Sequence, residues 1–166
     1  MIESVSPCSY AAGGQLDQRS QERESHEFED RVADVLRSMG FDVRVRFHLE
    51  VRGLHREIDQ LCISDGGKVV WAECKLKRNG GHVGIEVPLN LWGAYTYLQL
   101  AGVGNGFTPD RIWVVTNARF SGAARAFCRA VNQTMEREFF VLADGRRLER
   151  LNVTQPRHCA EKSRTT

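Results

Sequence analysis

Residues 58–78 read IDQLCISDGGKVVWAECKLKR, two apolar segments joined by a glycine-rich turn. The second segment starts with VVW at Val69, is apolar on both of its faces, and becomes polar at Glu73 and Lys75. Such a segment is typical of a central strand in a sheet that is covered on both sides. Because side chains alternate along a strand, Glu73 and Lys75 project to the same face. Burying either charge alone is costly, so the stretch predicts a local ion pair or a site that uses both charges.

The turn between the two segments predicts how they pair. If DGG at 65–67 forms a three-residue hairpin loop, Ser64 pairs with Lys68, and further along the ladder Asp59 pairs with Glu73. The two carboxylates would then share a face with their Cβ atoms about 5 Å apart. They would repel by roughly 3 kcal/mol at an effective dielectric constant near 20, whereas a favourable cross-strand pair contributes only about 0.2–1 kcal/mol. We therefore expect one acid to be protonated or a cation to lie between them.

A hard divalent cation suits this pair of acids. Mg²⁺ prefers oxygen ligands and often binds one or two carboxylates, with water and substrate phosphate completing its shell. Lys75 could orient an attacking water or offset negative charge on a phosphate. The side chain of Cys74 points to the opposite face, but its backbone carbonyl is directed along the sheet and could complete the metal shell. The alternatives are a structural ion pair between Glu73 and Lys75, or a thiol enzyme with Cys74 as nucleophile.

The composition is that of an ordinary soluble globular protein. The chain has 166 residues, 42% of them hydrophobic and 27% charged, which suits one domain with a full core. Five scattered cysteines without a CxxC spacing argue against a zinc cluster or a disulfide framework and favour reduced thiols in a cytoplasm. We expect neither a membrane span nor a secretory signal. The net charge of +2 does not by itself indicate a polyanionic partner.

The remaining sequence predicts one α/β domain over 25–152, between a disordered lead over 1–24 and a tail over 153–166. Ser25 and Ser121 are candidate helix N-caps, and Gly40 and Gly102 are candidate helix ends. The order α-β-β-β-α-β-α-β predicts a sandwich with a mixed central sheet covered by helices on both sides. The expected elements are a helix over 25–40, strands over 41–51, 56–64 and 68–76, a helix over 88–102, a strand over 111–120, a helix over 121–135, a strand over 137–145 and a short closing helix over 145–152.

Several motifs together resemble the PD-(D/E)XK nucleases, and among them the Mrr-like restriction endonucleases. Asp59, thirteen intervening residues and Glu73-Cys74-Lys75 resemble the D…ExK core, although no proline precedes the aspartate. EFEDRVADVLRSMGFDV resembles the opening helix of that family, in which an acid eleven positions before the glycine assists the metal site; that acid is Glu29. The stretch over 121–148 resembles the closing elements of the Mrr-like branch.

The resemblance implies a restriction-endonuclease-like α/β/α fold and a Mg²⁺-dependent endonuclease, with Mn²⁺ as a substitute metal. In that scheme Asp59, Glu73 and the backbone carbonyl of Cys74 bind the metal. Lys75 orients the attacking water, and Glu29 reaches a second metal or the shell around the first.

The implied substrate is nucleic acid, most readily double-stranded DNA. Arg56, Lys77, Arg78 and Arg119 are candidates for contacts to it, with a solvated basic face as the alternative. The resemblance also implies a homodimer where both strands are cut, and it leaves room for a targeting partner protein. The alternative functions are a structure-specific junction resolvase or repair nuclease, and a catalytically inactive nucleic-acid-binding module on the same fold.

Overall fold

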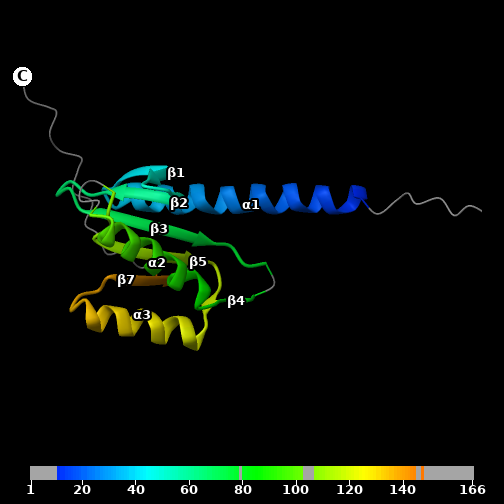
Figure 1. The fold of residues 1–166 in the computed structure, drawn as a ribbon. Helices are drawn as coiled ribbons and strands as arrows, with labels where there is room; N and C mark the ends of the chain where they lie inside the picture. Colours follow the sequence, from blue (N-terminus) through cyan, green and yellow to red (C-terminus); the bar gives the residue numbers. More distant parts are fainter. Residues whose placement is uncertain (1–10, 79, 103–106, 145–146, 148–166) are drawn as a thin grey trace, which may run out of the picture.

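A computed structural model of the chain describes residues 11–78, 80–102, 107–144 and 147. A mixed sheet lies between helices on its two faces (Figure 1). The elements, in chain order, are α1 (Ala11–Ser38), β1 (Asp42–Val51), β2 (Leu54–Ile63), β3 (Val69–Lys75), β4 (His82–Val83), α2 (Glu86–Leu100), β5 (Arg111–Thr116), β6 (Arg119–Phe120), α3 (Gly122–Thr134) and β7 (Phe140–Asp144).

The main sheet has five strands in the order β1-β2-β3-β5-β7. Strands β1, β2 and β3 are antiparallel neighbours, whereas β3, β5 and β7 run parallel. The strand β3 is therefore central, with a paired strand on each side. This arrangement confirms the predicted α/β sandwich with a mixed sheet.

Two apolar cores cover the two faces of the sheet. Helix α1 supplies Leu36 and its neighbours to one core, which also contains Val70 and Ala72 of β3. Helices α2 and α3 pack on the other face, where they bury Trp71 of β3. Figure 1 shows α1 along one side of the sheet and α2 and α3 on the other. Because β3 contributes to both cores, its first four residues are apolar without alternation.

The hairpin between β2 and β3 has the predicted register. The backbone N–H of Ser64 donates to the carbonyl of Lys68 at 3.0 Å, and Gly67 adopts the left-handed conformation with φ 72°. The ladder then continues to the pair of Gln60 with Ala72. It ends one position before Asp59 and Glu73, so both acids lie where β2 and β3 stop pairing.

The ladder between β1 and β2 is interrupted at the same level. Pairing skips from Val45 with Gln60 to Phe47 with Ile58. The skipped residue of β1, Arg46, has φ 51°, a left-handed backbone in the middle of a strand. Val45 packs against the α1-side core, whereas Phe47 packs against the opposite core. The break thus changes which face the side chains occupy, as a bulge does beside many active sites.

Helix α1 begins at Ala11 rather than at Ser25, so the expected disordered lead is wrong for residues 11–24. That segment lacks apolar periodicity, and polar pairs one helical turn apart stabilise it instead. Gln18 donates to Glu22 at 3.1 Å and Gln21 donates to Asp17 at 2.9 Å. Residues 1–10 and the expected tail over 153–166 lie outside the described residues.

The other local signals have mixed outcomes. Ser121 caps α3 by accepting a hydrogen bond from the N–H of Ala124 at 3.1 Å, as predicted. Gly40 and Gly102 follow the ends of α1 and α2 in left-handed conformations, also as predicted. The short parallel pair of β4 with β6 was not predicted. The expected closing helix over 145–152 lies outside the described residues apart from Arg147. No helix in the described part of the chain is long and apolar enough to span a bilayer.

Replacing Gly67 tests whether the turn fixes the hairpin. A residue with a Cβ atom at φ 72° costs roughly 1–2 kcal/mol. We expect Gly67→Ala to lower the free energy of unfolding by about this amount in urea denaturation. Gly66→Ala is the matched control, because its added Cβ has no closer neighbour than the Oγ of Ser64 at 3.9 Å. Equal losses in the two variants would contradict a conformational requirement at Gly67.

Candidate active site

Asp59 lies against the backbone of β3 at the end of the β2–β3 ladder. Its Oδ2 accepts a hydrogen bond from the backbone N–H of Cys74 at 2.7 Å. The N–H and C=O groups of one strand residue point to the same neighbouring strand. The carbonyl of Cys74 is therefore directed towards β2 as well. Two possible oxygen ligands for a metal, the Asp59 carboxylate and the Cys74 carbonyl, thus lie on the same side of β3.

Glu73 lies one residue further back on β3 and is held by two cations. It is only 8% exposed. The Nζ of Lys75 lies 2.8 Å from its Oε1, and Nη2 of Arg56 lies 3.5 Å from its Oε2. The buried Nε of Arg56 has no hydrogen-bond partner among the described residues. Asp59, Glu73, Lys75 and Arg56 together form a nearly neutral group in which Arg56 keeps an unused donor.

The titration of this group reflects the closeness of its charges. Burial, and then the charge of Glu73, raise the pKa of Asp59 to about 6, while the Cys74 N–H opposes the shift. Burial disfavours the charge of Lys75, but the attraction of Glu73 outweighs it and raises the pKa of Lys75. The conflict between the two acids that the hairpin register predicts is therefore present. The neighbouring cations Lys75 and Arg56 offset part of it by pairing with Glu73.

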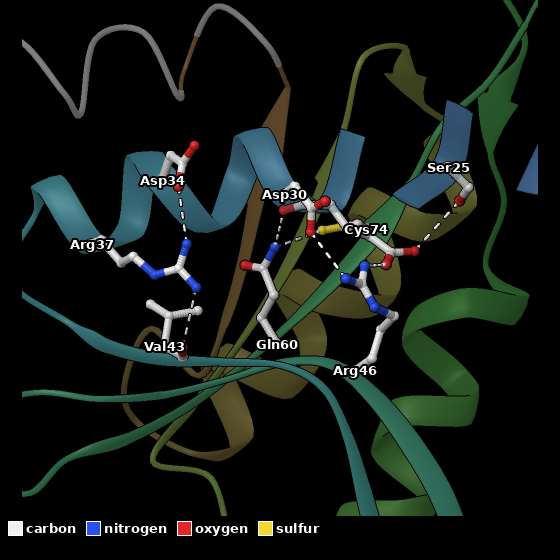
Figure 2. A network of polar contacts seen from close by, with 9 residues as sticks. Ser25, Asp30, Asp34, Arg37, Val43, Arg46, Gln60 and Cys74 are labelled. Atoms are coloured by element: carbon white, nitrogen blue, oxygen red, sulfur yellow. Dashed lines mark hydrogen bonds and ion pairs between the residues drawn. The ribbon is translucent and has the colours of Figure 1, made fainter. Parts of the chain in front are cut away.

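Glu29 lies on α1, on the other side of this group, and forms its own ion pair. Its Oε2 lies 3.0 Å from Nη1 of Arg46, and Ser25 donates to its Oε1 at 3.5 Å. Asp30 holds the second Nη of Arg46 at 3.2 Å (Figure 2). No group of three or more His, Cys, Asp and Glu side chains with metal-binding geometry occurs in the part of the chain that the structure describes. The charge of Glu29 nevertheless reaches the group, because it contributes to the raised pKa of Asp59.

Gln60 connects α1 with the two strands of the site. It is fully buried, and its Nε2 donates to the backbone carbonyl of Glu29 at 2.6 Å and to the Sγ of Cys74 at 3.6 Å (Figure 2). Its Oε1 has no hydrogen-bond partner among the described residues. The sequence reasoning missed Gln60. The available signal was a glutamine directly after Asp59, at an otherwise apolar position of β2.

The thiol of Cys74 faces α1 and the core rather than the charged group. It is 3% exposed, and burial raises its pKa well above the usual value. A nucleophilic cysteine needs a stabilised thiolate and access to substrate. The structure therefore argues against the thiol-enzyme alternative.

The four predicted nucleic-acid contacts lie in different surroundings. Arg56 lies beside Glu73. Lys77 is anchored by its backbone, since its N–H donates to Oδ1 of Asn117 at 2.8 Å. Arg78 pairs with Glu24 and Asp17 of α1 at 2.9 and 3.3 Å, away from Glu73. Arg119 is exposed on β6. Arg56 is therefore the member of this set that the fold brings to the acids.

Removing the charge of Asp59 should stabilise the metal-free protein. The pKa of Asp59 is about 6 in the fold and near 3.9 in an unfolded chain, so the folded state binds its proton more tightly. The stability therefore falls as the pH rises from about 4 to about 7. We expect Asp59→Asn, in EDTA at pH 8, to gain on the order of 1–2 kcal/mol in urea denaturation, and to gain little at pH 4.

A matched control for this experiment is Glu57→Gln, which removes an exposed carboxylate of the same strand. It should give no comparable gain at pH 8. The difference in unfolding free energy between wild type and Asp59→Asn should change with pH. A difference that stays constant between pH 4 and pH 8 would contradict the raised pKa of Asp59.

The backbone strain at Arg46 can be separated from its ion pairs. Arg46→Gly and Arg46→Ala both leave the buried Glu29 carboxylate without its cation, so both should be less stable than wild type. Only glycine accepts φ 51° without strain, so Arg46→Ala should be lower by a further ~1 kcal/mol in urea denaturation. At Arg44, an exposed strand residue with no positive φ, alanine should instead be the better replacement. The same order at both positions would argue against strain at Arg46.

Comparisons with known proteins fit this architecture. A search of curated proteins finds no match. A solved structure titled "Crystal Structure of Protein of Unknown Function AF1548" is similar, with a TM-score of 0.58 and 20% sequence identity. The similarity covers 75% of this chain and 64% of that one, less than two thirds of its length, and shows a shared fold. Residues 20–152 match the family model Mrr_cat, described as restriction endonuclease. The chain therefore belongs to the Mrr_cat restriction endonuclease family.

Proposed function

We propose that this protein is a Mg²⁺-dependent endonuclease that hydrolyses phosphodiester bonds in DNA. The observation that carries the proposal is the placement of Asp59, Glu73 and Lys75 at the open end of the β2–β3 hairpin. Membership in a restriction endonuclease family supports a role for these three residues in phosphodiester hydrolysis.

The donor chemistry of the site fits a hard divalent cation. Asp59, Glu73 and the carbonyl of Cys74 offer only oxygen ligands, which Mg²⁺ and Mn²⁺ accept. Burial, and then the negative charge of Glu73, raise the pKa of Asp59, and a bound cation would favour its charged form. When bound, the metal would act as a Lewis acid on the phosphate and make its water ligand more acidic. Glu29 adds to the negative potential, because its charge also raises the pKa of Asp59.

Lys75 and Arg56 would act on the phosphate itself. Without a metal, both cations share the carboxylate of Glu73. Once Glu73 serves as a metal ligand, the ammonium and the guanidinium become available for phosphate oxygens. Lys75 would orient the attacking water and offset charge that develops in the transition state, and Arg56 would hold the phosphate in position.

We infer contacts to the rest of the DNA from further cations, the half-buried Lys77 and the exposed Arg78 and Arg119. Lys77 and Arg119 are available for phosphates, whereas Arg78 would first have to leave Glu24 and Asp17. Cleavage of both strands would need a second active site, which a homodimer would supply. A targeting partner protein would be compatible with so small a catalytic domain.

Plasmid cleavage tests the proposed function. We expect wild type to nick or linearise plasmid in Mg²⁺, to do so in Mn²⁺, and to lose activity in EDTA. Asp59→Ala and Lys75→Ala should each reduce the cleavage rate by about 10²- to 10⁴-fold, because each removes a group needed in the transition state. Gel electrophoresis of time courses measures the rate.

The exposed Lys68, in the same hairpin, gives the control variant Lys68→Ala, which should cut like wild type. Circular dichroism should show all variants folded. Cleavage by Asp59→Ala at the wild-type rate would refute the proposed site. Loss of cleavage in Cys74→Ser, with Asp59→Ala unaffected, would point to the thiol enzyme instead.

A further inference from the structure

A hollow of about 490 Å³ lies between α2 and the charged group of the candidate site. One wall carries Arg56, Glu73 and Lys75. The facing wall is formed by α2, including Leu89 and Tyr97. Its volume is in the range of pockets that hold small organic ligands. The hollow therefore has one charged wall and one mainly apolar wall. It is large enough for one small molecule or one nucleotide.

The α2 wall is mainly apolar, with Asn90 as its polar member. Leu89, Gly93 and Tyr97 are spaced by four residues and so lie on one face of the helix. Leu89 is 49% and Tyr97 41% exposed. The hydroxyl of Tyr97 donates to the backbone carbonyl of Arg52, which fixes its ring at the wall. A Cβ atom added at Gly93 would meet no atom within 4 Å, so the space in front of the helix is open.

A nucleotide has the chemistry that such a hollow would bind. Its phosphate matches Lys75 and Arg56, and the buried Nε of Arg56 is a donor with no partner among the described residues. Its base is a flat, largely apolar group that packs on aromatic and aliphatic side chains. We infer that this hollow receives one unstacked nucleotide of the substrate, with its phosphate at Lys75 and Arg56 and its base against Leu89 and Tyr97.

This inference rests on the proposed nuclease function and narrows its substrate class. In a paired duplex the bases are stacked inside the helix and cannot reach a pocket next to the phosphate. A base enters only if it is unpaired or flipped out of the stack. The preferred substrate is therefore DNA with an unpaired or extruded nucleotide beside the cleaved phosphate.

A second copy of this chain would be a poorer occupant of the same hollow. The cores of protein–protein interfaces are depleted of charged residues. Covering the α2 wall with protein would also desolvate Arg56 and Lys75 beside it. A phosphate group compensates those two charges, whereas an apolar protein surface does not.

The test compares three DNA ligands of the same length by fluorescence anisotropy in Ca²⁺, which takes the same oxygen ligands as Mg²⁺: a paired duplex, a duplex with one unpaired nucleotide, and the latter with an abasic unit at that nucleotide. We expect the protein to bind the unpaired nucleotide about tenfold more tightly than either other ligand, the size of one base-stacking contact. Gly93→Leu fills the hollow and should reduce this preference to within about twofold. Gln99→Leu adds the same side chain at an exposed position of α2 outside the hollow and should keep the preference.

We expect Gly93→Leu to fold, because leucine has a higher helix propensity than glycine. Thermal melting of the variant checks that it is folded. Equal binding of the three ligands, or full preference in Gly93→Leu, would overturn the inference. A dimer in sedimentation experiments that Gly93→Leu dissociates, without any preference for the unpaired base, would assign the face to a second copy. Plasmid cleavage without such a preference would leave the nuclease proposal standing, and a preference without Mg²⁺-dependent cleavage would refute that proposal alone.

Discussion

The register of the β2–β3 hairpin is the constraint on which the candidate site depends. The DGG turn sets that register, and the ladder ends just before Asp59 and Glu73. Asp59 then bonds to the N–H of Cys74 instead of continuing the ladder. A slip of one residue would turn Glu73 and Lys75 towards the core under α1, where their charges would have no partners.

This arrangement has a cost in the absence of a cation. Burial, and then the charge of Glu73, raise the pKa of Asp59, so the fold makes the charged form of this acid unfavourable. Lys75 and Arg56 offset part of the repulsion by sharing Glu73. The same two cations are the groups best placed to meet a phosphate. Under the proposed function, the two cations would leave Glu73 for the substrate phosphate, so the electrostatic cost of the metal-free site would serve catalysis.

Helix α1 and strand β1 support the site from the opposite face. Arg46 adopts a left-handed backbone at the level of Asp59 and ties β1 to Glu29. Gln60 ties β2 to the backbone of the same glutamate and to Cys74. These contacts link three elements behind the hairpin end, so that the position of Asp59 depends on more than its own strand. The hollow at α2 lies on the other face, and the two sets of contacts do not overlap.

Short-range patterns in the sequence determined much of this protein. The glycine turn gave the hairpin register, the doubly apolar VVWA run gave a central strand, and Ser121 gave the cap of α3, because each depends on neighbours within a few residues. Tertiary structure decided the rest. The left-handed Arg46, the contacts of Gln60 and the pairing of Arg56 with Glu73 join residues that are far apart in sequence, and no local rule specifies them. The part of α1 before Ser25 makes polar pairs and contacts Arg78 of a distant loop, and it carries no apolar pattern that would signal a helix.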